Sequence, residues 1–226
     1  MSHYTVLVIG NDPEEQLEPY WELDLTQEEM RNDFRAEFIS KDVEIRANWH
    51  DQSFFTSDYV KENYPERFEK SPSEVFRDIE TFVKDWYGYI CDEDTGDFGY
   101  FANPNAKWDW YQLGGRWTGV FELKPESIGE GNLGESGLMT QKITTPNRAD
   151  QAIKGDIDFH AMRQRDGEAF SVFAVLKDGI WYEQGEMGWF GLVSNEKNKN
   201  DWQTEFEMLI NNLPDDTLLS VYDCHI

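Results

Sequence analysis

Basic residues are scarce in this chain, and their scarcity limits what it can bind. The 226 residues include 20 Lys and Arg against 45 Asp and Glu, which gives a formal net charge of −25. Such a surface repels polyanions over several Debye lengths. We therefore expect no direct binding of nucleic acid or of an anionic membrane, unless a local basic pocket overrides the field. The acidity either keeps the protein soluble, which is the commoner role, or presents carboxylates to a basic partner protein.

Cysteine is also scarce, and no stretch of the sequence is apolar over the roughly 18 residues that a membrane span needs. The two cysteines, Cys91 and Cys224, lie far apart and form no CxxC unit. Together with the absence of a signal peptide, this pattern predicts a cytoplasmic protein with reduced thiols. A bridge between the two cysteines remains open, although a buried apolar role is commoner for such thiols.

The sequence lacks the motifs of the common enzyme and metal-site classes. It has no GxSxG, no Walker loop, and no HxxH or HExxH spacing among its four histidines. We therefore assign no catalytic residue and expect no metal site and no cofactor. Gly10 follows an apolar run, but the next residues supply no further glycine for a dinucleotide fingerprint. Residues 92–97 miss the glycine and glutamate positions of a calcium loop, so a hairpin turn is the expected structure there.

Aromatic residues, by contrast, are abundant. Fifteen Phe, ten Tyr and nine Trp, within a hydrophobic content of 39%, indicate a folded chain with a sizeable core. Their density is highest at residues 86–117, where ten of thirty-two side chains are aromatic, against 15% in the whole chain. This region ends in the segment 107–117, Lys-Trp-Asp-Trp-Tyr-Gln-Leu-Gly-Gly-Arg-Trp, which is the leading candidate for a binding site.

Segment 107–117 combines stacking surfaces, two cations and a glycine pair. Tryptophan faces can stack on a flat ligand, Lys and Arg can contact its phosphates, and adjacent glycines permit positive φ or the close approach of another backbone. The alternative is a strand pair whose aromatic side chains fill an ordinary core, with a glycine turn between the strands. The candidate ligand-binding residues of the segment are Lys107, Trp108, Asp109, Trp110, Gly114, Gly115, Arg116 and Trp117.

Two further stretches complete this hypothetical pocket. At residues 154–158, Lys154 would contact a phosphate and Asp156 or Asp158 the ribose hydroxyls, although a helix cap and a local ion pair are commoner roles for such residues. At residues 185–191, three glycines surround two aromatic residues and a carboxylate, so Glu186 and Trp189 would form a facing wall.

A third pattern lies at the C-terminus. Asp223 and His225 are two residues apart in a predicted strand, so their side chains share one face and could form an oriented base. An ordinary surface or pocket contact is the commoner role for such a pair.

Strand patterns occur at both ends of the chain. Residues 4–10 form a β-branched apolar run and residues 217–224 form a second, and both are typical of buried strands. An Asp-Gly turn predicts a hairpin over residues 170–182. Strands are also predicted at residues 98–101 and 117–123.

Helix signals separate these strands. Ser71, Pro72 and Glu74 satisfy the rules for a helix start, and Thr26 and Glu29 have capping-box spacing. Residues 39–49 alternate between apolar and polar like a strand, but their secondary structure stays ambiguous. Residues 51–70 are expected to form a long segment on the surface. The expected helices span residues 26–38, 71–86, 147–154, 158–165 and 200–212.

These elements predict one α+β domain over residues 1–226, with helices packed on a mixed, mostly antiparallel sheet. The two terminal strands are expected at the centre of that sheet. A glycine-rich segment at residues 125–137 is expected to be a flexible loop.

Five stretches of the chain, residues 1–16, 103–117, 154–158, 185–189 and 213–226, together resemble an uncharacterised family of phage and prophage proteins. The resemblance implies an accessory phage protein that acts in the host cell cytoplasm, in a class where counter-defence proteins are common. Such proteins include acidic mimics of nucleic acid and sponges for nucleotide immune signals. The family has no established activity, so the resemblance implies no functional residue.

We therefore expect a non-catalytic protein that sequesters a small nucleotide-like anion, such as a host immune signal, in an aromatic, Arg and Lys pocket. The first alternative is an acidic inhibitor that mimics nucleic acid and binds a basic host defence protein. The second is a nucleotide-processing enzyme. The sequence leaves the ligand, the partner and the oligomeric state open.

Overall fold

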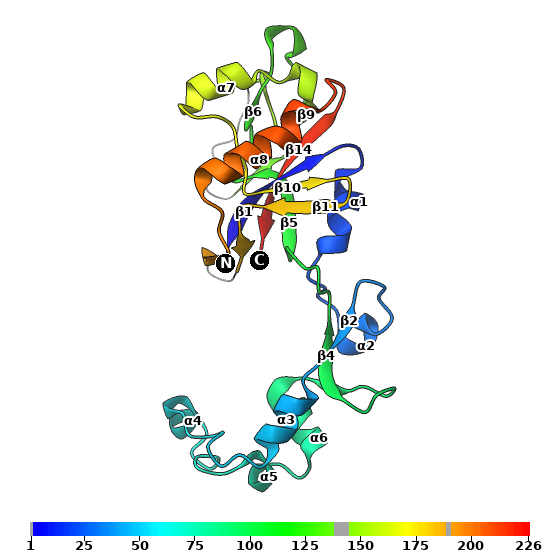
Figure 1. The fold of residues 1–226 in the computed structure, drawn as a ribbon, viewed down its shortest axis with the longest axis vertical. Coiled ribbons are helices and arrows are strands. Elements are labelled where there is room, and N and C mark those ends of the chain that lie inside the picture. The colour runs from blue at the N-terminus through cyan, green and yellow to red at the C-terminus, as the bar shows by residue number, and fades with distance from the viewer. Residues whose placement is uncertain (1, 138–144, 189–190) are drawn as a thin grey trace. The chain divides into compact units, whose positions relative to one another are not determined.

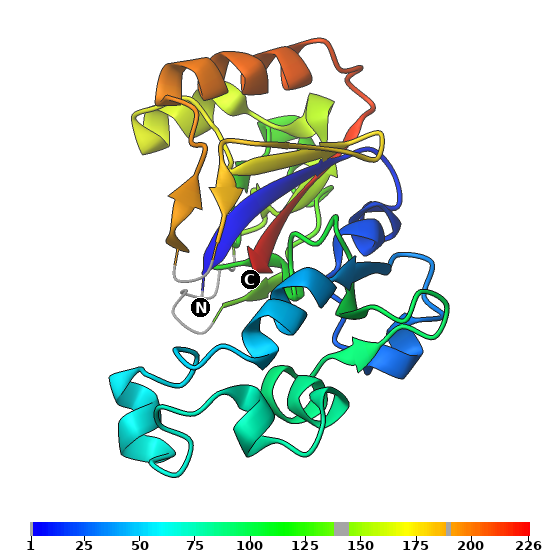
Figure 2. The ribbon, with the colours of Figure 1, turned by 60° about the horizontal axis from the view of Figure 1, so that its bottom comes forward.

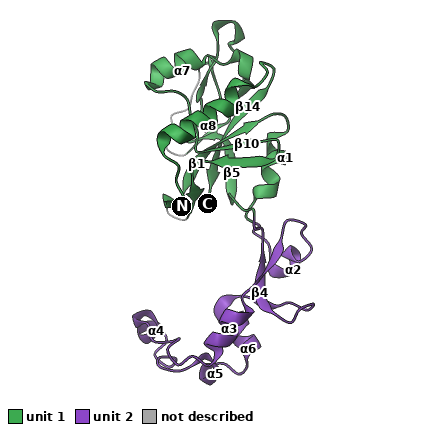
Figure 3. Ribbon diagram, viewed as in Figure 1, with its two compact units in different colours: residues 1–22, 105–226 green, residues 23–104 purple. Residues whose placement is uncertain are grey.

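The computed structural model describes residues 2–137, 145–188 and 191–226 (Figure 1). The chain divides into two compact units, with residues 1–22 and 105–226 in unit 1 and residues 23–104 in unit 2 (Figure 3). The expectation of one domain stays a prediction, because compactness does not test whether each unit folds alone. Within the described ranges, no helix is long and apolar enough to cross a membrane.

Unit 1 is built on a seven-stranded sheet, whose strands are β1 (His3–Ile9), β5 (Trp110–Gly115), β7 (Glu135–Ser136), β9 (Gln151–Ile153), β10 (Ala174–Lys177), β11 (Ile180–Glu183) and β14 (Leu218–His225). The strand order is β11-β10-β1-β14-β5-β7, and β9 also pairs with β14 (Figure 1). β1 runs parallel to β10 and antiparallel to β14. The predictions of an α+β fold and of central terminal strands are confirmed.

The two faces of this sheet carry separate cores, because side chains alternate along each strand. Leu7 and Val221 lie on one face, which α7 (Phe159–Asp166) and α8 (Lys199–Asn211) cover (Figure 2). Val6 and Tyr222 lie on the other face, against α1 (Pro13–Leu17). We call the first the helix face and the second the α1 face. Burial on both faces explains why β1 reads as a continuous apolar run.

The Asp-Gly turn of unit 1 was predicted correctly, and helix α8 begins one residue before its expected start. The Asn198 side chain caps α8 by accepting from the Asn200 and Asp201 N–H groups. The hairpin of β10 and β11 turns at Asp178 and Gly179, whose φ values are 52° and 71°. Positive φ at both central residues suits the twist of the flanking strands.

Two predictions in unit 1 were wrong. Residues 147–154 form β8 (Arg148–Ala149) and β9 instead of a helix, because pairing with neighbouring strands buries Ala149 and Ala152. The strand expected at 117–123 is only β6 (Phe121–Glu122). The remaining short elements of unit 1 are η1 (Glu18–Tyr20), η3 (Pro125–Ser127), η4 (Lys154–Asp156), β12 (Glu186–Met187) and β13 (Val193–Ser194).

Unit 2 consists of short elements, which are α2 (Gln27–Met30), β2 (Glu37–Ser40), α3 (Asp42–Trp49), α4 (Asp58–Asn63), α5 (Pro72–Val75), α6 (Ile79–Phe82), η2 (Val83–Tyr87), β3 (Ile90–Cys91) and β4 (Phe98–Ala102). Its sheet has the order β2-β4-β3. The turn expected at 92–97 joins β3 to β4. Cys91 and Cys224 are both free thiols.

The long helices expected in unit 2 were wrong in extent. The Thr26–Glu29 capping box is present, but the helix ends at Met30 and leaves Phe34 85% exposed. The helix that begins at Pro72 breaks after Val75. It resumes as α6, where the Asp78 side chain accepts from the Thr81 N–H. Asp competes with the helix interior for backbone donors, which favours a new cap over a continuous helix.

Candidate functional site

Segment 107–117 is divided between the two faces of the unit 1 sheet. Trp108 is buried on the α1 face, where its Nε1 donates to the Leu17 carbonyl at 3.1 Å. The Lys107 ammonium is paired with Glu183 at 2.7 Å. Both side chains therefore have partners within the protein and contribute to its packing.

Trp110 belongs to the other face, together with the two histidines at the chain ends. In the sheet, His225 pairs with His3 on β1 and with Trp110 on β5. The His3 ring centroid lies 4.9 Å from that of His225 and 6.3 Å from that of Trp110, both at steep interplanar angles. We call His3, His225, Asp109, Asp223 and Trp110 the histidine cluster.

Each histidine of the cluster is held by a carboxylate. His3 Nδ1 lies 2.8 Å from Asp223 Oδ1, and His225 Nδ1 lies 2.6 Å from Asp109 Oδ1. A carboxylate only accepts, so both Nδ1 atoms carry the proton and Nε2 is left for another partner. The Nε2 atom of His225 is buried and has no hydrogen bond to any described residue. The His3 side chain is 16% exposed, so solvent reaches its ring.

Because Gly114 and Gly115 have no side chains, the buried carboxylates of Asp150 and Asp223 can approach the backbone at this turn. Gly114 and Gly115 have φ values of 75° and 52°. A Cβ at Gly115 would lie 2.4 Å from Asp223 Cβ, and one at Gly114 would lie 2.3 Å from Asp150 Oδ2. The Arg116 N–H then donates to Asp223 Oδ2 at 2.9 Å, while the Arg116 side chain is exposed. The turn therefore fixes the backbone of Arg116 beside the histidine cluster.

Asp150 holds the same turn through hydrogen bonds, and no sequence pattern indicated this role. Its buried carboxylate accepts from Thr118 Oγ1 at 2.8 Å, from the Gly119 N–H at 2.5 Å and from the Gly134 N–H at 2.9 Å. Burial raises the pKa of Asp150 despite these donors. Nothing in the sequence separates Asp150 from the many other acidic residues of this chain.

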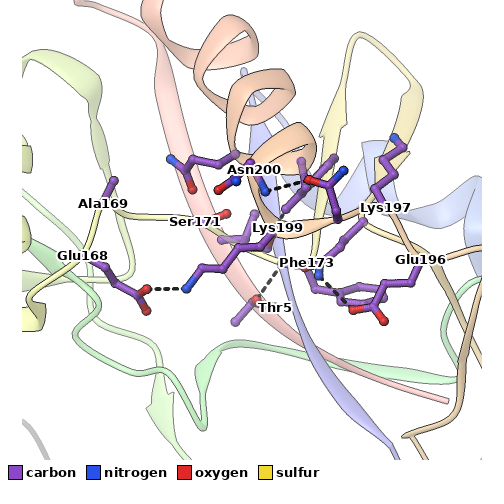
Figure 4. A pocket seen from close by; sticks show the side chains of 14 residues that line it. Thr5, Glu168, Ala169, Ser171, Phe173, Glu196, Lys197, Lys199 and Asn200 are labelled. Carbon is purple, nitrogen blue, oxygen red and sulfur yellow. Dashed lines mark hydrogen bonds and ion pairs between the residues drawn. The ribbon is translucent and has the colours of Figure 1, made fainter.

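A hollow of about 810 Å³ also opens within unit 1, beside the N-terminus of α8 (Figure 4). Thr5 lines it and lies opposite Asp223 in the β1–β14 ladder. Lys199 reaches across it to Glu168 at 2.6 Å, and the Thr5 hydroxyl accepts from the Phe173 N–H at 3.0 Å. Thr5 shares the helix face of β1 with His3, but no residue of the histidine cluster lines the hollow itself. The sequence analysis did not identify this hollow.

The second predicted stretch makes its contacts elsewhere in unit 1. Lys154 donates to the Leu213 carbonyl at 2.6 Å and lies 3.8 Å from Asp215. Asp156 accepts from Ser127 Oγ at 2.7 Å. Asp158 caps α7 by accepting from the Ala161 N–H at 2.9 Å. The cap role of Asp158 is thus confirmed, whereas the ion pair of Lys154 is with the distant Asp215 and is not the local pair that was expected. None of the three residues belongs to the histidine cluster or lines the hollow.

The remaining predicted residues do not join the histidine cluster either. Glu186 accepts from Ser194 Oγ at 3.1 Å across β12 and β13. Trp117 is half-buried after the glycine turn. Trp189 lies outside the described residues. Within the described ranges, no group of three or more His, Cys, Asp or Glu side chains could hold a metal ion.

Comparison with known proteins transfers no function to these residues. No family model matches the chain, and no curated protein or solved structure matches it. The resemblance to a phage family therefore stays a hypothesis. The assignment of function depends on the histidine cluster, the glycine turn and the hollow.

Proposed function

We propose that this protein binds a small nucleotide-like anion at the histidine cluster of unit 1. The observation that carries the proposal is the placement of Trp110 and Arg116. An exposed indole and the backbone of an exposed arginine are held beside two carboxylate-oriented imidazoles. A base could stack on Trp110 while the guanidinium contacts phosphate oxygens through two parallel hydrogen bonds.

The charge pairing of unit 1, together with position, supports Arg116 as the phosphate contact. Lys107, Lys154 and Arg165 are engaged by carboxylates or carbonyls of the protein, and the exposed Arg163 lies on α7, away from the histidine cluster. Within the described residues, the Arg116 guanidinium makes no hydrogen bond or ion pair. An arginine whose backbone is fixed but whose side chain is free can pair with an incoming anion without breaking an internal contact.

The net charge favours a small ligand over a polymer. A surface with a net charge of −25 repels a polyanion over a long range, whereas one or two phosphates beside a local cation are repelled much less.

The first experiment is a thermal-shift and calorimetric screen against cyclic and linear nucleotides and ADP-ribose derivatives. These compounds include the immune signals that the phage hypothesis suggests. A ligand present at about 100 times its Kd should add roughly 2.7 kcal/mol to stability.

The same screen is then repeated with variants. Arg116→Ala should weaken binding roughly 10- to 100-fold, because a charge-assisted hydrogen bond contributes about 1.5–3 kcal/mol. Trp110→Ala should weaken it similarly through loss of stacking. The matched controls are Arg163→Ala and Ile180→Ala, which remove an exposed arginine and an exposed apolar side chain elsewhere in unit 1. Unchanged affinity in the first pair, or an equal loss in the controls, would contradict the proposal.

A second candidate follows from the net charge alone. The acidic surface could bind a basic protein, such as a host defence nuclease, by mimicking nucleic acid. That complex would weaken steeply with added salt and would be indifferent to Trp110→Ala. Salt titration of a captured complex therefore separates the two candidates.

A further inference from the structure

We infer that His3 and Asp223 form an acid–base dyad that hydrolyses a phosphodiester of the bound ligand. This inference rests on the proposed binding function, because the nucleotide must first occupy the histidine cluster. Beyond binding, His3 would act as the base in the hydrolysis of that ligand.

The Asp223 carboxylate is built into the fold as an orienting group. Its side chain is 2% exposed, and both of its oxygens are occupied. Oδ1 accepts from His3 Nδ1 at 2.8 Å, and Oδ2 accepts from the Arg116 N–H at 2.9 Å. Three segments that are distant in the sequence thus fix one imidazole in one tautomer. This arrangement leaves a lone pair on Nε2 of His3, which is the form that a general base needs.

A purely structural role would not require this arrangement. Burying a carboxylate is costly even when it is paired, and apolar residues of similar size often stabilise a fold as well or better. Here the buried Asp223 carboxylate holds the His3 ring, which solvent reaches, next to the exposed Arg116. Thr5, which pairs with Asp223 in the sheet, lines the hollow. The combination of a fixed base that solvent reaches and a neighbouring cation is what hydrolysis at phosphorus requires.

His225 has a different part in the site. Asp109 orients it in the same way, but its Nε2 atom is buried. Its ring packs edge-on against His3 at 4.9 Å between centroids. His225 is therefore a positioning residue that limits the orientation of the His3 ring, and His3 is the catalytic base.

The reaction is the addition of water to a cyclic phosphodiester of a nucleotide. His3 Nε2 takes a proton from water as the water oxygen attacks phosphorus, and one phosphorus–ester oxygen bond breaks. The departing oxygen takes a proton from solvent, and the imidazolium returns its own proton to solvent. The Arg116 guanidinium would neutralise the non-bridging oxygens, where negative charge accumulates. The products are a linear phosphomonoester and a free hydroxyl group.

The experiment incubates the full-length protein with 2′,3′-cyclic AMP, 3′,5′-cyclic AMP and a cyclic dinucleotide, and follows phosphorus by NMR. The expected result is conversion of at least one bound probe to its monoester. His3→Gln should lower the rate roughly 100-fold or more while the probe still binds. Arg163→Ala, outside the cluster, should leave the rate unchanged.

The pH profile of the rate gives a further test. The pH dependence of the wild-type rate should be absent from the residual rate of His3→Gln, which has no imidazole at this position to act as the base. His225→Gln should lower the rate less than His3→Gln does. Binding without turnover, a flat profile, or a wild-type rate in His3→Gln would overturn the inference and leave the proposed binding intact. Failure of every probe to bind would overturn both.

Discussion

The two units of this chain use aromatic residues in different ways. In unit 1, rings such as Phe206 and Tyr222 are packed against a sheet whose backbone pairing fixes each strand. In unit 2, Phe82 on α6 is packed against other rings, including Tyr87 on the short helix η2 and Phe54 in a turn. A sheet can therefore hold polar side chains at set distances, whereas a cluster of rings on short helices mainly excludes water.

The two units also differ in how far apart along the chain their paired charged residues lie. In unit 2, Asp33 pairs with Arg35 and Asp42 with Arg46, within four residues along the chain, although Arg31 also reaches Asp92 and Glu93. In unit 1, Asp223 is bonded to His3, which lies at the other end of the sequence. Pairs of the first kind stabilise local structure, whereas the pair of His3 with Asp223 joins two strands of a sheet at the candidate site. This comparison explains why the candidate site lies in unit 1.

The strongest test of the comparison truncates one buried ring in each unit. Phe206→Ala and Phe82→Ala should each destabilise the surrounding core by about 4 kcal/mol, the usual effect of removing a buried phenyl ring. We expect Phe82→Ala to remove hydrogen-exchange protection in unit 2 while β1 and β14 keep theirs. Phe206→Ala should lower protection across unit 1. Equal losses in both units for both variants would instead show one cooperative domain, as the sequence predicted.

A second test uses two aspartates whose pKa values shift in opposite directions. Hydrogen bonds from the Arg35 side chain lower the pKa of Asp33 from 3.8 to about 2. Its contribution to stability is therefore present above pH 3.8 and lost as the pH falls through about 2. Burial raises the pKa of Asp150 above 3.8. Its contribution is present below pH 3.8 and lost as the pH rises through the raised value.

The loss of stability caused by Asp33→Asn should therefore become smaller as the pH is lowered. The loss of stability caused by Asp150→Asn should become smaller as the pH is raised toward neutral. At pH 3 we expect Asp150→Asn to cost on the order of 2 kcal/mol, because its amide nitrogen would face backbone N–H donors. Urea unfolding at a series of pH values measures both slopes. Parallel slopes would show that the two carboxylates do not differ as described.

The smallest expected effect tests where helix α2 ends. Met30 and Phe34 share one stripe in the sequence, but Met30 is buried whereas Phe34 is 85% exposed. Phe34→Ala should change the free energy of unfolding by less than about 0.5 kcal/mol, whereas Met30→Ala should cost about 2 kcal/mol or more. Urea unfolding distinguishes these values. A large effect at Phe34 would support the longer helix that the stripe predicts.

Elements with strong local signals were predicted from the sequence. β1, β14, α8 and the hairpin at Asp178 carry apolar runs, a cap or a turn that determine their structure over a few residues. The helix expected at 147–154 failed because β9 forms by pairing with β14, which no local pattern reports. Short segments with weak periodicity take the structure that their neighbours in space allow.

The candidate site was likewise predicted from the sequence only in part. The sequence predicted Asp109, Trp110, Gly115 and Arg116 as ligand-binding residues, which stays a prediction, and noted Asp223 and His225 as a pair on one strand face. It also assigned Trp108 and Lys154 to this pocket, but Trp108 is buried on the α1 face and Lys154 contacts the Leu213 carbonyl. Lys107, assigned there too, pairs with Glu183, because residue type alone does not show where a side chain lies in the fold.

The sequence by itself determined that the chain folds as α+β, that its ends form buried strands, and that segment 107–117 is rich in binding chemistry. Only the tertiary structure decided that His3 is bonded to Asp223, that Gly115 gives Asp223 room, and that Trp110 lies beside both histidines. Strand pairing brings residues together across more than 200 positions. Those contacts depend on register and on close packing, which are properties of the assembled sheet and not of any one segment.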